Sequence, residues 1–276
     1  MAQPDLHELK AILQTALRAT AQGRKVLQSY FGRVRNIEEK FQAGLVSEAD
    51  RESEKTIAQI LKTAYPDIEF LGEESFAAGI HPDYKPTVKG QRWILDPLDG
   101  TTNYIHQFPI YCISLGLEWD GEIVVAVIDV PELGETYTAV KGGGSYVNGR
   151  KLQVSQTKNL KDSFLATGFF GENIPALEEQ LKIFSSVVRK CRGVRRAGAA
   201  AYDLCQVARG VFDGYWEKNL GAWDSAAGIL IVSEAGGVIS NYQGEAFHPY
   251  MKSIVAAAPG VMPHLLAEIK MNASNP

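Results

Sequence analysis

Two aspartates, Asp96 and Asp99, end a short apolar run in the segment RWILDPLDGTTNY, residues 92–104. Like charges this close together raise each other's pKa unless a cation neutralises them. Mg2+ prefers carboxylate, carbonyl and water oxygens as ligands. Pro97 biases Asp96 towards extended backbone and stiffens the turn between the two carboxylates. The segment therefore predicts an oxygen-ligand metal site. A plain acidic turn is the alternative, because Pro, Asp and Gly are also the usual turn residues.

Small residues follow the second aspartate directly. Gly100, Thr101 and Thr102 present backbone amides at a predicted helix start. Such amides, together with the helix dipole, form a natural cradle for a phosphate group.

Four further acidic residues stand at the ends of predicted elements. Glu73 and its neighbour Glu74 close the strand predicted in IEFLGEES, Asp224 opens an apolar helix in AWDSAAG, and Asp50 follows Ser47 at a capping-box-like helix start. The simplest interpretation of Asp50 and Asp224 is helix capping, and that of Glu73 is a solvated strand end.

The elements that must position these residues follow from periodicity. Apolar spacing predicts an amphipathic helix over 6–30, a second helix over 47–66, a strand over 92–95 and an antiparallel meander over 110–155. Strands and helices alternate in the rest of the chain, which favours layered α/β or α+β packing. We expect one domain, 1–276, with a soft subdivision into a metal-binding half, 1–155, and an α/β half, 156–276.

Composition excludes several classes of protein. The 276 residues are 45% hydrophobic and carry a net charge of −4. A protein that binds nucleic acid usually has a basic surface, which this net charge does not indicate, although basic residues cluster over 189–196. No apolar run reaches the roughly 18 residues of a membrane span, and the start has no signal pattern. Three cysteines without CxxC spacing fit a reduced cytoplasm.

The chain offers no convincing protein nucleophile or zinc site. It has no G-x-S-x-G or H-E-x-x-H motif, and its five histidines lack metal-ligand spacing. The glycines 142–144 lack the Lys-Ser/Thr of a P-loop and are interpreted as a turn between strands.

With these segments, the sequence resembles the inositol monophosphatase family of Mg2+-dependent, lithium-sensitive phosphomonoesterases. GEES, WILDPLDGTTNYIHQFP and WDSAAGILIVSEAGG match its three signature segments in order, and weaker matches carry the resemblance over nearly the whole chain. The resemblance implies a layered αβαβα sandwich of the sugar-phosphatase type, two or three Mg2+ ions and, as a rule, a homodimer.

The resemblance also implies roles for individual residues. Glu73, Asp96 and the carbonyl of Leu98 match ligands of a first Mg2+, and Asp96, Asp99 and Asp224 match ligands of a second, with a third, water-held ion near Glu73. Thr101 with Asp50 matches the pair that activates the attacking water. The Gly100 and Thr101 amides match phosphate contacts, and Asp224 also borders the substrate. Gly198, Ala200 and Glu217 match the positions that line the alcohol side.

Departures from the family pattern concern the flap or the water-held third ion in the first case and the substrate in the second. Gly44 replaces an aspartate common before the capping segment, and Gly198-Ala199-Ala200 lacks the hydroxyl of the usual G-[ST]-A. The expected activity is hydrolysis of inositol monophosphate by metal-activated water, without a covalent intermediate. Alternatives are a broad-specificity sugar phosphatase acting also on fructose 1,6-bisphosphate, and a bacterial family member with an added role in transcription antitermination.

Overall fold

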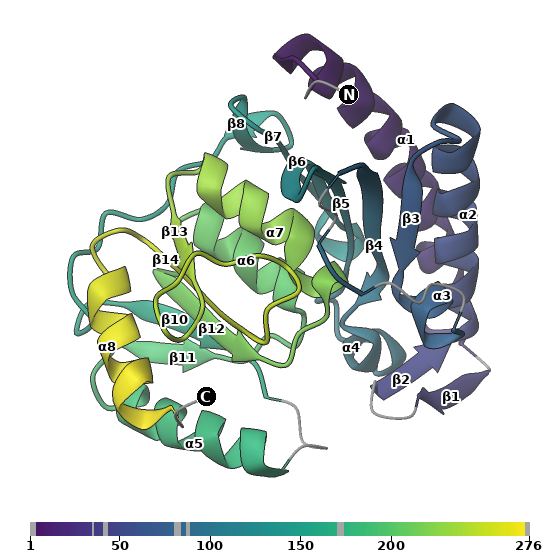
Figure 1. Ribbon diagram of the computed structural model, residues 1–276. Helices are drawn as coiled ribbons and strands as arrows, with labels where there is room; N and C mark the ends of the chain where they lie inside the picture. The colour runs from purple at the N-terminus through teal and green to yellow at the C-terminus, as the bar shows by residue number, and fades with distance from the viewer. Residues whose placement is uncertain are drawn as a thin grey trace.

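The computed structural model describes residues 4–34, 36–40, 44–79, 84–86, 89–169 and 174–273. These residues form five layers, helix, sheet, helix, sheet and helix (Figure 1), which confirms the predicted αβαβα sandwich. Among them, no helix is both long and apolar enough to cross a membrane.

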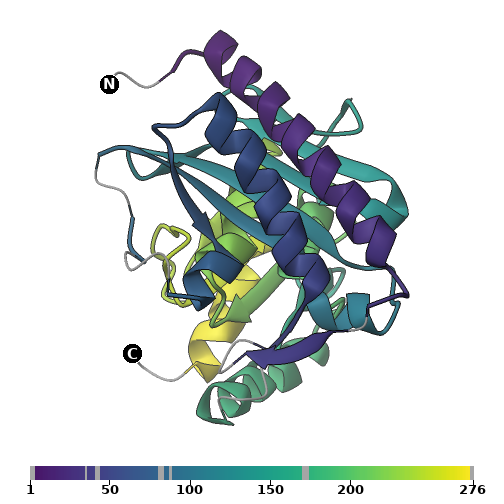
Figure 2. The ribbon, with the colours of Figure 1, turned by 90° about the vertical axis from the view of Figure 1, so that its right-hand side faces the viewer.

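Two long helices form the first layer and run side by side across one face of the larger sheet (Figure 2). They are α1 (Leu6–Tyr30) and α2 (Glu48–Ala64). α1 has the predicted bounds and begins at a capping box, in which Asp5 accepts from the Glu8 amide at 2.9 Å. Both helices bury an apolar stripe against the sheet, in a core that includes Leu27, Ile57 and Trp93.

The larger sheet has seven strands in the order β3-β4-β5-β6-β7-β8-β9. β3 and β4 are parallel, and every later pair is antiparallel, as the predicted meander requires. The strands are β3 (Glu69–Gly72), β4 (Gln91–Asp99), β5 (Cys112–Trp119), β6 (Glu122–Val130), β7 (Glu135–Val140), β8 (Gly144–Val147) and β9 (Arg150–Lys151). A short 3-10 helix, η1 (Pro131–Leu133), joins β6 to β7.

The smaller sheet comes from the second half of the chain and has the order β11-β10-β12-β14-β13. Its strands are β10 (Phe164–Thr167), β11 (Gly193–Arg195), β12 (Gly214–Lys218), β13 (Val238–Ser240) and β14 (Ser253–Ala257). The helices α6 (Ala200–Ala208) and α7 (Ala222–Glu234) lie between the two sheets, while α5 (Ile174–Val188) and α8 (Met262–Asn272) cover the far face (Figure 1).

The middle layer is the reason that residues far apart in the sequence meet. α7 contacts β4, β5 and β6 of the larger sheet, and α6 contacts strands of both sheets. One buried core therefore includes Ile94 and Ile128 from the first half together with Leu204 and Ile231 from the second. The division of the chain near residue 155 remains a prediction.

Some local features were not predicted, or were predicted wrongly. A two-stranded hairpin, β1 (Ile37–Lys40) with β2 (Gly44–Ser47), precedes α2 and had no prediction. The expected strand IEFLGEES ends at Gly72, because Glu73 and Glu74 open the short helix α3 (Glu73–Ala77). The glycines 142–144 form the predicted turn, and the Gly142 and Gly144 amides each donate to the Glu234 carboxylate at 2.7 Å.

Candidate metal and phosphate site

The centre of the site is an irregularity at the end of β4. We expected this strand to stop at Leu95, but it continues to Asp99, and its register with β5 shifts between Asp96 and Asp99. β3 pairs with β4 only as far as Leu95, so Pro97 lies at the shift, where its missing N–H breaks no regular ladder. The shift brings the Leu98 amide to within 2.9 Å of Asp96 Oδ1, to which it donates.

Asp224 joins these residues from α7. Oxygens of Asp96, Asp99 and Asp224 all lie within 4.8 Å of one another. Asp224 is the third residue of α7 rather than its N-cap as expected, and its carboxylate accepts from the Gly221 amide at 2.6 Å. The bond to the helix start orients the side chain, and the structural and the metal-binding interpretations of Asp224 are therefore compatible.

The electrostatics of this cluster favour a bound cation. Burial raises the pKa of Asp96 well above its ordinary value, and the negative charges of Glu73, Asp99 and Asp224 raise it further. Burial also raises the pKa of Asp99 to about 7, although the amides of Ala200 and Ala201 donate to its carboxylate at 3.2 and 2.7 Å. Charged carboxylates packed this closely are unfavourable alone, and their oxygens are the ligands that a hard divalent ion prefers. The residues present therefore fit Mg2+.

The charge of Glu73 acts on the cluster from a different element. It is the first residue of α3, directly after β3, and Gly72 at the end of β3 pairs with Leu95, the residue before Asp96. The close cluster within 4.8 Å comprises the three aspartates. The charge of Glu73 nevertheless ranks second, after burial, among the causes that raise the pKa of Asp96.

A buried aspartate and a threonine lie beside the cluster. Asp50 is the third residue of α2 rather than its N-cap, which is Ser47, and the predicted capping box is present. Ser47 donates to Asp50 Oδ2 through its amide and its hydroxyl at 2.9 and 2.5 Å. Thr101 Oγ1 lies 3.2 Å from the other carboxylate oxygen, Asp50 Oδ1, and 3.0 Å from the Leu98 carbonyl.

Gly100 lets the chain turn between Asp99 and Thr101. It has a φ of 88° and is the N-cap of the short helix α4 (Thr101–Ile105), which confirms the predicted helix start. Any Cβ on Gly100 would lie 3.2 Å from the Ala199 Cβ and 3.3 Å from the Gly198 carbonyl. Glycine thus allows the segment carrying Thr101 to pack against the one carrying Gly198 and Ala200.

The residues expected on the alcohol side line a small pocket of about 100 Å3 next to the aspartates. It is lined by Asp99, Gly168, Arg196, Gly198, Ala199, Ala200, Asp203, Glu217, Leu220 and Asp224. Gly198, Ala200 and Glu217 therefore line one pocket, and their place on the alcohol side of a substrate stays a prediction. Burial raises the pKa of Glu217 to about 7, and the Tyr215 hydroxyl donates to its carboxylate at 2.5 Å.

Two charged residues of this pocket, Arg196 and Asp203, were not predicted. Asp203 is only 1% exposed, and its Oδ1 has no hydrogen-bond partner among the residues that the structure describes. Arg196 brings a positive charge that opposes the rise in the pKa of both Glu217 and Asp203. Asp203 follows Ala200 by three residues in α6, so helical spacing was the signal that could have placed both residues on one face.

Fold and site together define a layered α+β protein with a candidate metal site of clustered carboxylates at a strand end. The model of the inositol monophosphatase family matches residues 8–273. The chain belongs to this family.

Named relatives differ in their stated activity. The chain is 41% identical to the inositol-1-monophosphatase of Rhizobium meliloti, covering 85% of this chain and 86% of the relative. It is 40% identical to the fructose-1,6-bisphosphatase/inositol-1-monophosphatase of Aquifex aeolicus, covering 88% and 89%. It is 37% identical to the Nus factor SuhB of Pseudomonas aeruginosa, covering 95% and 100%.

Solved structures agree with the fold. The extragenic suppressor protein suhB of Bartonella henselae superposes with a TM-score of 0.85 at 37% identity, covering 94% of this chain and 98% of the other. The IMPase of Thermotoga maritima superposes with a TM-score of 0.85 at 27% identity, covering 95% and 97%.

Proposed function

We propose that this chain is a Mg2+-dependent phosphatase that hydrolyses a small polyol or sugar monophosphate, with inositol monophosphate as the preferred substrate. One observation carries the proposal: oxygens of three aspartates lie within 4.8 Å of one another, next to a threonine hydroxyl paired with a buried aspartate. Such a site needs a cation to be stable and holds a group suited to water activation beside it.

Metal binding is assigned to the strand and helix ends. Glu73, Asp96 and the Leu98 carbonyl would hold one Mg2+; Asp96, Asp99 and Asp224 would hold a second, and a third would lie near Glu73. When bound, the ions would lower the pKa of water and neutralise charge on the phosphate. The buried carboxylates keep their orientation through backbone amides, namely those of Leu98 for Asp96 and Ala201 for Asp99.

Proton removal from the attacking water is assigned to Thr101 and Asp50. The Thr101 hydroxyl has one proton, which it can donate to Asp50 while its lone pairs accept a hydrogen bond from water. Asp50 is fully buried and held by Ser47, so its carboxylate is fixed where it can take that proton. No protein nucleophile is required, and the product forms without a covalent intermediate.

Substrate orientation is assigned to two groups of residues. The amides of Gly100 and Thr101 would contact the phosphate, and Gly198, Ala200 and Glu217 would border the alcohol, with Asp224 between them. The Glu217 carboxylate can accept hydrogen bonds from ring hydroxyls, which supports a polyol as the leaving group.

The substrate is tested with a panel of phosphate monoesters. Phosphate release with Mg2+ is measured for inositol 1-phosphate, fructose 1,6-bisphosphate and 3'-phosphoadenosine 5'-phosphate. We expect at least a tenfold higher kcat/KM for inositol 1-phosphate. The relative from Aquifex aeolicus, named for both activities, makes fructose 1,6-bisphosphate the most informative competitor.

A second role in transcription is supported by the relative named Nus factor SuhB in Pseudomonas aeruginosa. The basic cluster over 189–196 is partly engaged within the molecule, because Lys190 pairs with Glu268 at 2.6 Å and Arg192 with Asp162 at 3.0 Å. The test is binding to RNA polymerase by the inactive variant Asp96→Asn; retained binding supports a separate role. A homodimer and a cytoplasmic location remain predictions.

A further inference from the structure

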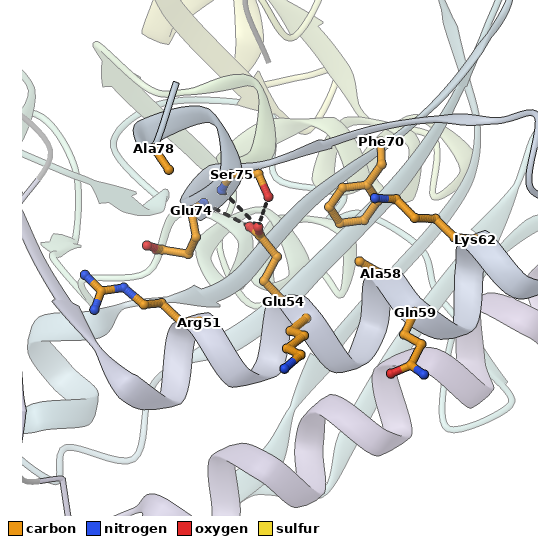
Figure 3. Close-up of a pocket in the computed structure, with 10 residues that line it drawn as sticks. Arg51, Glu54, Ala58, Gln59, Lys62, Phe70, Glu74, Ser75 and Ala78 are labelled. Carbon is orange, nitrogen blue, oxygen red and sulfur yellow. Dashed lines mark hydrogen bonds between the residues drawn. The ribbon is translucent and has the colours of Figure 1, made fainter. Parts of the chain in front are cut away.

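Glu54 of α2 caps the N-terminus of another helix, α3. Its side chain crosses the gap between the two helices (Figure 3), and Oε2 accepts from the Glu74 amide at 2.9 Å. Oε1 accepts from the Ser75 amide at 2.9 Å and from the Ser75 hydroxyl. Glu54 is only 5% exposed, although it borders an open groove of about 540 Å3. Three donors thus converge on one buried carboxylate.

α3 depends on this carboxylate because it has no cap of its own. The helix has five residues, too few to be stable alone, and its N-cap is Gly72, which has no side-chain cap. The first amides of a helix have no partner within it, and a negative charge there is favourable. Glu54 therefore supplies, from 20 residues away, the acceptor that a serine or aspartate N-cap would supply locally.

Gly72 makes room for the cap. A Cβ on Gly72 would lie 2.3 Å from Glu54 Oε2 and 2.8 Å from the Phe70 ring. Gly72 also pairs with Leu95 at the end of β3. Sheet register thus fixes the residue before Glu73, and Glu54 fixes the amides of the two residues after it.

The same face of α2 contacts the site at two more points. Asp50, one turn before Glu54, meets Thr101 at 3.2 Å, and the Ser53 hydroxyl donates to the Pro97 carbonyl at 3.2 Å. Asp50, Ser53 and Glu54 are all buried. Ser53 and Glu54 lie three and four residues after Asp50, which places them on the same side of the helix as Asp50.

We propose that Glu54 is a positioning residue for the acidic site: by fixing the start of α3 it directs Glu73 towards Asp96 and so raises the affinity of the site for its divalent ion. The proposal rests on the proposed function for what the site binds. Glu54 itself accepts from the Glu74 and Ser75 amides and from the Ser75 hydroxyl.

The test compares Glu54→Gln with Glu52→Gln. Glu52 is exposed on the same helix, and its replacement removes the same charge. Binding of Mn2+ to the purified full chain, followed by electron paramagnetic resonance without substrate, should weaken about 10- to 100-fold in Glu54→Gln, the usual effect of losing a group that orients a ligand. Glu52→Gln should bind as the wild type does.

Activity gives a second readout that a merely structural cap would not move. In Glu54→Gln the Mg2+ concentration for half-maximal phosphate release should rise by a similar factor, while kcat at saturating Mg2+ stays within a few-fold of wild type. Gly72→Ala, which crowds the same carboxylate, should shift the metal dependence in the same direction. If Glu54→Gln does not fold, Gly72→Ala and Ser75→Ala, which removes only the hydroxyl bond, take its place in both measurements.

Unchanged Mn2+ binding and Mg2+ dependence in the folded variants would overturn the proposal. So would a fall in kcat that saturating Mg2+ does not restore. Failure of the proposed function would look different. The wild-type chain would then either bind no Mn2+ or bind Mn2+ that Asp96→Asn does not remove.

Discussion

Thr101 Oγ1 lies 3.2 Å from Asp50 Oδ1, although 51 residues separate the two in the chain. α2 and the segment after β4 bring them together at the edge of the aspartate cluster. Because Asp50 is fully buried and its second oxygen is held by Ser47, the contact is rigidly placed.

Removal of the Thr101 hydroxyl should slow the chemical step. Thr101→Ala should lower kcat by about 10^2- to 10^4-fold, the usual contribution of a positioned proton acceptor. The Mg2+ concentration for half-maximal activity should hardly change, because the aspartates are untouched. Thr101→Ser keeps the hydroxyl and should retain most activity. Equal rates for the alanine and serine variants would exclude the assigned role.

The metal-free protein should lose stability as pH rises from about 4 to 7. The pKa of Asp99 is 3.8 ordinarily and about 7 in the folded chain, so the folded state binds more protons in that window. The free energy of unfolding therefore falls with rising pH, and the contribution present below 3.8 is lost by about 7. Thermal unfolding is measured from pH 4 to 7 for the EDTA-treated wild type and for Asp99→Asn. The contribution of Asp99 is the difference between their two curves of stability against pH.

Added Mg2+ should reverse that loss. A ligand present at 100 times its Kd stabilises the folded state by about 2.7 kcal/mol, which raises the Tm of a chain of this size by roughly 5–10 °C. The rise should be larger at pH 8 than at pH 5, because the ion competes with protons for the carboxylates. An equal rise in Asp96→Asn would show that the ion binds elsewhere.

Replacement of Glu217 should alter recognition of the alcohol. Glu217→Gln should lower kcat/KM for inositol 1-phosphate by roughly 10- to 100-fold, the cost of a lost hydrogen bond to a charged group. p-Nitrophenyl phosphate, which has no ring hydroxyls, serves as the control substrate and should change little. Gly168→Ala should act in the same direction, because a Cβ there would lie 2.0 Å from the Glu217 carboxylate. A parallel loss on both substrates would assign Glu217 to the chemical step.

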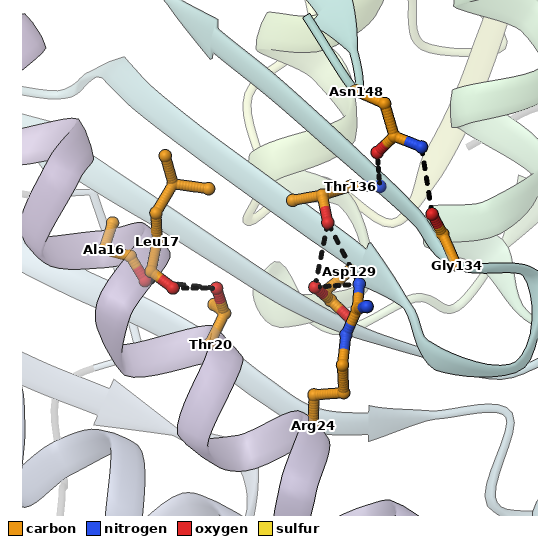
Figure 4. A network of polar contacts seen from close by, with 8 residues as sticks. All are labelled: Ala16, Leu17, Thr20, Arg24, Asp129, Gly134, Thr136 and Asn148. Carbon is orange, nitrogen blue, oxygen red and sulfur yellow. Dashed lines mark hydrogen bonds and ion pairs between the residues drawn. The ribbon is translucent and has the colours of Figure 1, made fainter.

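Arg24 should stabilise the fold without affecting catalysis. It joins α1 to the larger sheet by two bonds to Asp129, at 2.7 and 2.6 Å, and one to Thr136 (Figure 4). Asp129 is 2% exposed, so Arg24→Met leaves a buried carboxylate without its cation. Urea unfolding should show a loss of about 3 kcal/mol. The rate per folded molecule should stay at the wild-type value. A changed Mg2+ dependence in Arg24→Met would contradict a purely structural role for Arg24.

Local patterns in the sequence were sufficient to place α1 and the antiparallel meander and to single out Asp96, Asp99 and Asp224, whose oxygens lie within 4.8 Å of one another. The β4 strand was underestimated because Pro97 normally ends a strand, whereas here the register shift accommodates it. The helix α3 was missed because its cap, Glu54, comes from another helix, so no local signal marks it. Asp203 lies three residues after Ala200 on α6, but it was missed because only the packing of α6 against β12 brings that face beside Glu217.

The most direct test of the central claim is phosphate release from inositol 1-phosphate by EDTA-treated protein as Mg2+ is added back. The proposed site predicts no turnover without Mg2+, full recovery in the wild type and none in a folded Asp96→Asn variant, with Asp67→Asn, an exposed aspartate, recovering normally. Turnover that persists in EDTA, or that returns in Asp96→Asn, would contradict it.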